Sequence, residues 1–227
     1  MAAIPEISFS VFRKRSAPDW LIRKRKYFEK KWNTANDGTK LIRRIMRTCR
    51  LCFPSPILKS GITVMMYRYS RKKHGSLVGS VSPARPNRIS LYIKEDDRYS
   101  NLKANLCHEL LHVLMWSCIR CDYRRVAVSL FADVFADELL VTMLEELIIK
   151  GKLHEVDFEW ALDYARSETI TRLKNLKRER DYKTIIEELK IFLKDYRRAI
   201  RQGSNALIER QRALRDILSP LDPSLDE

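Results

Sequence analysis

Residues 101–116, NLKANLCHELLHVLMW, constrain the fold more than any other stretch, because they predict a helix with apolar side chains on almost every side. Its apolar positions include Leu106, Leu110, Val113, Leu114 and Trp116. A helix that is apolar all round is buried in a core, where polar side chains without partners are costly. We therefore expect the polar side chains of His108, Glu109 and His112 to have specific partners.

The two histidines are four residues apart, so their imidazoles project from the same face of the helix and can bind one metal ion. Zinc held there lowers the pKa of a bound water toward about 7. Glu109 stands beside His108 and can take a proton from that water as a general base. The alternative, an amphipathic helix with exposed histidines, is disfavoured by the apolar surroundings. The stretch thus predicts a zinc site that hydrolyses peptide bonds.

The next helical segment, residues 126–148, contains acidic side chains that could serve as a third zinc ligand. At 100° per residue, Glu138 lies on the stripe formed by Phe131, Val134, Phe135 and Thr142, and it is the favoured candidate. Asp133 and Asp137 lie on another apolar edge, where they could be ligands or could orient the histidines. His154 is a further candidate, and a site without a third protein ligand is the remaining alternative.

Three short stretches rich in β-branched and aromatic residues predict strands at 61–69, 74–82 and 87–93. Their close spacing favours an antiparallel meander. The rest of the chain is mainly helical in pattern. We expect an α+β fold: a small antiparallel sheet, an HExxH active-site helix beside 87–93, and a helical C-terminal extension.

The composition divides the chain into three segments. Residues 1–55 form a basic helical N-terminal segment, 56–151 a core that contains the predicted zinc site, and 152–227 a charged helical C-terminal extension. The bound substrate is expected to extend along an edge strand, for which 87–93 is the candidate.

The strand-like residues 87–93, followed by the helix at 102–116, resemble the zinc-peptidase domains of SprT-like and ImmA/IrrE-like proteins, which are minimal zincins. The resemblance covers roughly residues 62–149, and FADELL at 135–140 is similar to a stretch of the ImmA/IrrE-like kind. It implies zinc at His108 and His112 and a catalytic base at Glu109. The chain departs from SprT-like proteins at the third ligand, since no histidine follows soon after the motif. Gluzincin-like proteins use a Glu on a following helix, as Glu138 would be.

Two C-x2-C pairs, Cys49 with Cys52 and Cys118 with Cys121, could together form a structural four-thiolate zinc site. Their wide separation favours the alternative that they are small apolar residues beside helix ends. Cys107 is expected in the core. An odd total of five cysteines and the lack of a secretory signal predict a cytoplasmic, intracellular protein.

The chain carries 44 Lys and Arg against 29 Asp and Glu, a net charge of +15. Such an excess favours contact with nucleic acid or other anionic surfaces, and basic residues interleaved with aromatics gather in the first 75 positions. A solvated basic surface is the alternative. No apolar run is long enough to cross a bilayer.

We therefore predict a zinc metalloendopeptidase, a hydrolase that acts on a protein or peptide and has a possible DNA-binding surface. The alternative is a nucleic-acid-binding or assembly protein that retains a zincin fold with zinc in a structural role.

Overall fold

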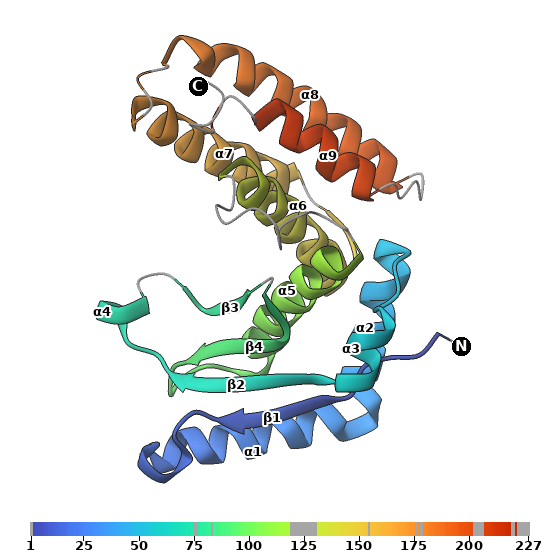
Figure 1. Cartoon of the computed structure of the whole chain (residues 1–227), viewed down its shortest axis with the longest axis vertical. Coiled ribbons are helices and arrows are strands. Elements are labelled where there is room, and N and C mark those ends of the chain that lie inside the picture. The colour runs from blue at the N-terminus through green and yellow to red at the C-terminus, as the bar shows by residue number, and fades with distance from the viewer. Residues whose placement is uncertain are drawn as a thin grey trace. The chain divides into compact units, whose positions relative to one another are not determined.

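The computed structural model describes residues 2–74, 77–82, 84–118, 131–153, 155–175, 177, 179–201, 207–218 and 221 (Figure 1). The chain divides into two compact units, Met1–Arg124 and Arg125–Glu227. The first holds a sheet and its covering helices, and the second is helical where it is described. The two units leave the predicted boundaries at residues 55 and 151 untested. The N-terminal segment 1–55 contributes one strand, β1, to the same sheet as the strands of the predicted core 56–151.

The first unit holds a four-stranded sheet with the strand order β1-β2-β4-β3. Its strands are β1 (Ile7–Val11), β2 (Ile62–Arg68), β3 (Gly79–Ser82) and β4 (Arg85–Ile93). The predicted strands at 61–69, 74–82 and 87–93 correspond to β2, β3 and β4. β1 lies in a stretch for which no strand was expected.

The predicted antiparallel sheet is wrong, because β1 pairs with β2 and β2 pairs with β4 in parallel. Only β3 and β4 are antiparallel. The physical reason is the length of the connections: parallel neighbours need long crossovers, and antiparallel neighbours can be joined by a short turn. Helices connect β1 to β2, whereas two residues separate β3 from β4.

Helices cover one face of this sheet. They are α1 (Asp19–Asn33), α2 (Asp37–Cys49), α3 (Ser55–Ser60) and α5 (Tyr99–Cys118), with the short α4 (Arg71–His74) and two 3-10 turns, η1 (Lys14–Ser16) and η2 (Thr34–Asn36), between other elements. α1 runs beside β1, and α5 packs on β4 and β3 (Figure 1). The expected contact between the 101–116 helix and the 87–93 strand is therefore confirmed.

The alternation of the strands explains this one-sided cover. On β1, Phe9 and Val11 are buried, and Phe9 meets Phe28 of α1 edge to face with ring centroids 5.2 Å apart. The same alternation buries Val64 and Met66 of β2, and Ile89 and Leu91 of β4. The intervening side chains point to the opposite face.

Specific side-chain contacts join the helices of this unit. Gly38, in the first turn of α2, lies against the indole of Trp32, so that a Cβ at position 38 would come within 2.1 Å of a ring atom. Asp37, one residue earlier, accepts hydrogen bonds from Tyr99 Oη at 2.6 Å and Lys103 Nζ at 2.7 Å, both on α5.

The second unit contains α6 (Phe131–Lys150), α7 (Glu155–Asn175), η4 (Glu179–Asp181), α8 (Tyr182–Arg201) and α9 (Leu207–Leu218). α6 packs on α7 and α9, and α8 packs on α7 and α9. Buried side chains on all four of its α-helices, among them Leu139, Ala165, Leu189 and Leu214, form its core. The predicted helices of the C-terminal third are present, with a break before α8. No described helix combines the length and the apolar character needed to cross a membrane.

Candidate metal centre

His108 and His112 lie on consecutive turns of α5, and their imidazoles face each other. The two Nε2 atoms are 3.0 Å apart, and the rings meet edge to face with centroids 4.7 Å apart. His112 is buried and His108 is partly exposed. The neighbouring apolar positions Leu106, Leu110, Val113 and Leu114 are fully buried, as the sequence predicts.

Glu109 is buried on the adjacent face of α5, at 5% exposure. Its side chain lies against Gly79 of β3, where an added Cβ would come within 2.5 Å of Glu109 Oε1 and 3.0 Å of Cδ. Gly79 therefore provides the space that the carboxylate occupies. Sequence reasoning missed this residue, since a lone glycine in a strand-like stretch indicates only a bulge or a close approach of backbone.

Glu138 of α6 completes the group of candidate ligands. Among the residues that the structure describes, one group of three could hold a metal ion: His108, His112 and Glu138 each offer one ligand atom, and these atoms all lie within 4.8 Å of one another. The three residues favoured as metal ligands in the sequence analysis are therefore the same three whose ligand atoms lie close together in the structure. That they bind zinc stays a prediction.

The other ligand candidates are placed differently. Asp137 is buried at 1% exposure but does not belong to this group. The side chain of Asp133 and the whole of His154 lie outside the described residues.

Tyr164 of α7 is a second residue that sequence reasoning missed. Burial raises the pKa of its hydroxyl, and the negative charges of Glu138 and Glu168 raise it further. Its ring stacks on Trp160 with centroids 5.6 Å apart. Tyr164 therefore lies close enough to Glu138 for the two side chains to interact electrostatically. The spacing of these residues in the sequence does not indicate this proximity.

The cysteine pairs give no second metal group in the described part of the chain. Cys49 is buried in the core and Cys52 is exposed. The side chain of Cys118 and the whole of Cys121 lie outside the described residues, so the four-thiolate site stays a prediction. Cys107 is fully buried, as expected.

The strand beside α5 is not the predicted edge strand. β4, which contains 87–93, pairs with β2 on one side and β3 on the other, so its backbone hydrogen-bonding groups already have partners. The edge on this side of the sheet is β3. The sequence could not show this, because the order of strands depends on the parallel pairing of β2 with β4.

The donor set is chemically suited to a divalent transition metal. Zn²⁺ takes imidazole nitrogen and carboxylate oxygen, and three protein ligands leave a position open for water or substrate. Tetrahedral zinc with Zn–N bonds of about 2.05 Å holds two nitrogens about 3.3 Å apart. The two Nε2 atoms are 3.0 Å apart, which is a hydrogen-bonding distance and is somewhat shorter than that value. No protein-family model, curated protein or solved structure matches this chain.

Proposed function

We propose that this chain is a zinc-dependent metallopeptidase in which His108, His112 and Glu138 hold the metal and Glu109 is the general base. One observation carries the proposal: the three candidate ligand atoms lie within 4.8 Å of one another. The buried carboxylate of Glu109 follows His108 directly in α5, which supports a catalytic site rather than a purely structural one.

Zinc in this site would supply Lewis acidity, which polarises a peptide carbonyl and makes water more acidic. The chain supplies the proton transfers. Glu109 accepts a proton from the attacking water and returns it to the leaving amine, so that the carboxylate is regenerated after each cycle. Its carboxylate is held against Gly79, in the space that a side chain at position 79 would fill.

The substrate is proposed to bind in extended form along β3. This strand is at the edge of the sheet and has Gly79 next to Glu109. An extended peptide can add to such an edge through main-chain hydrogen bonds, which do not depend on the substrate sequence. β3 replaces 87–93 as the candidate for this role.

Metal analysis of the purified chain tests the proposal, with Glu109→Gln and His112→Ala as the main variants. The wild type should hold one zinc per chain and cleave an unfolded protein substrate. Glu109→Gln should keep the zinc, because Glu109 is not among the candidate ligands, and should lose about 10²- to 10⁴-fold in activity. His112→Ala should lose both zinc and activity.

Glu159→Gln is the matched control, since it removes an exposed carboxylate from α7. It should retain zinc and activity. Zinc in the wild type without cleavage of any unfolded substrate would favour a structural role for the metal. Absence of metal, or another metal at full occupancy, would reject the zinc assignment.

A further inference from the structure

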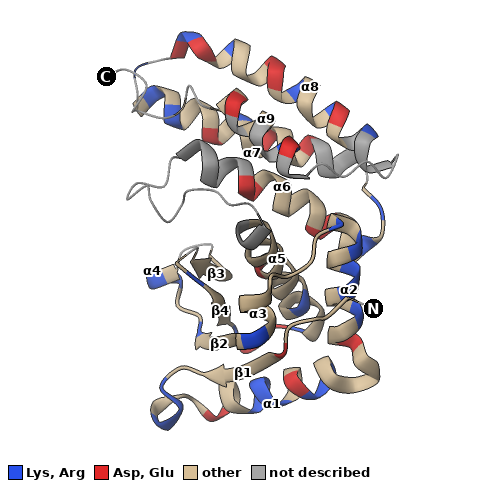
Figure 2. Cartoon of the chain, turned by 45° about the vertical axis from the view of Figure 1, so that its right-hand side comes forward, with Lys and Arg blue, Asp and Glu red and all other residues tan. Residues whose placement is uncertain are grey.

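The positive charge of the chain belongs to one of its two units. Met1–Arg124 contains 26 Lys and Arg against 9 Asp and Glu, whereas Arg125–Glu227 contains 18 against 20. The first unit therefore carries the entire net excess. In Figure 2 blue positions recur on α1 and α2, while red and blue both recur along α8. A charge so confined indicates an anionic partner for the first unit.

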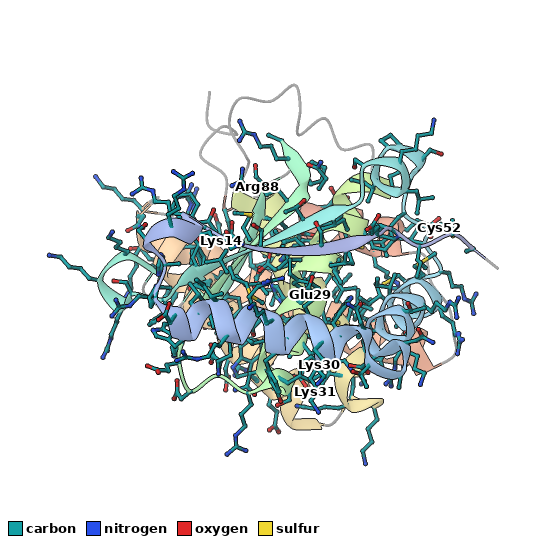
Figure 3. The ribbon with its side chains drawn as sticks, turned by 90° about the horizontal axis from the view of Figure 1, so that it is seen from below. Lys14, Glu29, Lys30, Lys31, Cys52 and Arg88 are labelled. Carbon is teal, nitrogen blue, oxygen red and sulfur yellow. The ribbon has the colours of Figure 1, made fainter. Side chains whose placement is uncertain are left out.

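The face of the sheet opposite α1 and α5 is the surface of interest, and we call it the outer face. Its side chains are those of the alternate, incompletely buried positions: Ser8, Ser10, Thr63, Met65, Tyr67, Ser80, Arg88, Ser90 and Tyr92. Figure 3 shows Arg88 on one side of β1 and the labelled residues of α1 on the other. None of the four strands contains an Asp or Glu. The outer face thus combines hydroxyl, aromatic and cationic groups without a strand carboxylate.

A continuous row of rings crosses one end of this face. Tyr67 and Tyr92 are cross-strand neighbours with ring centroids 5.6 Å apart. Phe12 stacks on Tyr67 at 4.7 Å, and His74 stacks on Tyr92 at 4.1 Å. Phe12 extends β1 by donating its backbone N–H to Met66 O, and its side chain is 39% exposed. Tyr67, His74 and Tyr92 are only partly buried and lie outside the core, which makes a ligand the better explanation for the row.

Cations accompany these rings. The Arg13 guanidinium lies over the Phe12 ring at 5.3 Å from its centroid, and Lys94 Nζ lies over the Tyr69 ring at 4.7 Å. Arg88 is exposed on the outer face itself, and three further exposed cations lie on α4, at Arg71, Lys72 and Lys73. The nearby acids Glu95, Asp96 and Asp97 follow β4, and Asp97 accepts a hydrogen bond from the Lys94 backbone N–H. Positive charge therefore dominates around the row.

We propose that the outer face binds single-stranded nucleic acid, with bases stacking on the aromatic row and phosphates contacting the flanking cations. Every base has a π face, so stacking needs no particular sequence, and Arg and Lys pair with the backbone. A duplex keeps its bases stacked on each other and cannot use the rings. A membrane surface is disfavoured because Ser and Thr surround the rings, and an acidic peptide offers no planar bases. This assignment is independent of the metal centre.

A pocket on α2 provides a contrasting basic feature in the same unit. It has a volume of about 540 Å³ and is lined by Arg43, Arg47 and Arg50 together with Ala2, Met46, Leu51 and Cys52. It contains no aromatic ring, so it can attract phosphate but cannot stack bases. A triple Arg→Gln variant at this pocket therefore separates general electrostatic attraction from stacking.

Fluorescence anisotropy with a labelled 20-nucleotide DNA strand, and with its duplex, tests the proposal at 50 and 200 mM salt. The wild type should bind the single strand more tightly than the duplex and should weaken as salt rises. The double variant Tyr67→Ala/Tyr92→Ala should lose about 100-fold in affinity, because base stacking is worth about tenfold or more per ring. Tyr67→Phe/Tyr92→Phe keeps both rings and should bind within about twofold of the wild type.

Circular dichroism checks that each variant folds. Should the double Ala variant fail to fold, Phe12→Ala at the exposed end of the row serves instead, with an expected loss of about tenfold. The Arg43→Gln/Arg47→Gln/Arg50→Gln variant should weaken both substrates together and keep the preference for the single strand. The proposal is overturned by equal binding of single strand and duplex, by ring variants that bind like the wild type, or by binding to anionic vesicles without binding to DNA.

Discussion

Gly79 of β3 lies directly against the carboxylate of Glu109 of α5. An added Cβ at position 79 would come within 2.5 Å of Oε1 and 3.0 Å of both Cδ and Cγ. Real Cβ atoms do not approach other heavy atoms so closely, so any other residue would move the carboxylate or the strand. The contact between Gly79 and Glu109 therefore sets the position of the edge strand β3 relative to the proposed general base.

Gly79→Ala should lower peptidase activity by about 10- to 100-fold while leaving the metal bound, because misplacing a catalytic group by about 1 Å costs that much. Activity and zinc content are measured on the same preparation. In a Glu109→Gln background the Gly79→Ala change should have little further effect, since the displaced group is already disabled. Ser10→Ala on β1, at the opposite edge of the sheet from the proposed substrate strand, is the control and should stay active. A fully active Gly79→Ala variant would show that the Glu109 position is not critical.

Glu138→Ala should weaken zinc binding by at least about tenfold, because it removes one of three candidate ligands. Competition with a chromophoric chelator measures the affinity. Glu145→Gln, two turns further along the same helix, is the comparison that separates a lost ligand from a general disturbance of α6. Equal zinc affinity in Glu138→Ala and wild type would exclude Glu138 as the third ligand and return Asp133, Asp137 and His154 to consideration.

Metal removal should destabilise the wild type. A ligand that binds only the folded state, at a free concentration of 100 times its Kd, raises the free energy of unfolding by about 2.7 kcal/mol. For a chain of this size, that corresponds to a rise of roughly 5–10 °C in the thermal midpoint. A chelator should produce such a drop in the wild type and none in His112→Ala, which has no metal to lose. Differential scanning calorimetry provides the measurement. An unchanged wild-type midpoint would mean that the metal does not support the fold.

The sequence predicted those features that depend on local pattern. The apolar surroundings of His108 and His112 indicated a buried helix, and the β-branched residues of 61–69 and 87–93 indicated strands that the structure contains. Helical periodicity also selected Glu138, whose ligand atom lies with those of the histidines. In each case the side chains repeat with the period of the element that they form.

Features that depend on pairing between distant segments could not be predicted. The parallel pairing of β1 with β2 is one of them. The stretch ISFSV alternates apolar Ile7, Phe9 and Val11 with serines, as a strand does, but it does not show which strand it pairs with. The contact between Gly79 and Glu109 and the row from Phe12 to His74 both arise from strand order. Strand order is set by the whole sheet, and no single stretch of sequence contains it.

Gly38→Ala should destabilise the first unit. A Cβ there would come within 2.1 Å of the Trp32 indole, which is itself buried against Phe9 and Phe28. Overpacking of this kind typically costs about 1–3 kcal/mol. Urea unfolding measures the change, and Thr39→Ala, at the next position of α2, is the control. A Gly38→Ala variant as stable as the wild type would show that the indole can move without cost.

The carboxyl of Asp37, which joins α2 to α5, makes the first unit sensitive to acid. Burial alone would raise the pKa of this carboxyl, but the hydrogen bonds from Lys103 and Tyr99 outweigh that effect, and the net shift is downward. A carboxyl whose pKa is lower in the folded state stabilises the fold above its unfolded value of about 3.9, and this stability is lost as pH falls through the folded pKa.

Asp37→Asn should therefore lower the free energy of unfolding at pH 7, by about 1 kcal/mol given that both partners are partly exposed to solvent. The difference in unfolding free energy between the wild type and Asp37→Asn should persist down to about pH 5. It should shrink as the pH falls below about 3.9, because the wild-type carboxyl then becomes protonated and, like the Asn side chain, carries no charge. Urea unfolding at pH 7, 5 and 3 measures the difference. Equal stability of the two proteins at pH 7 would show that the contact between α2 and α5 does not depend on the charge of Asp37.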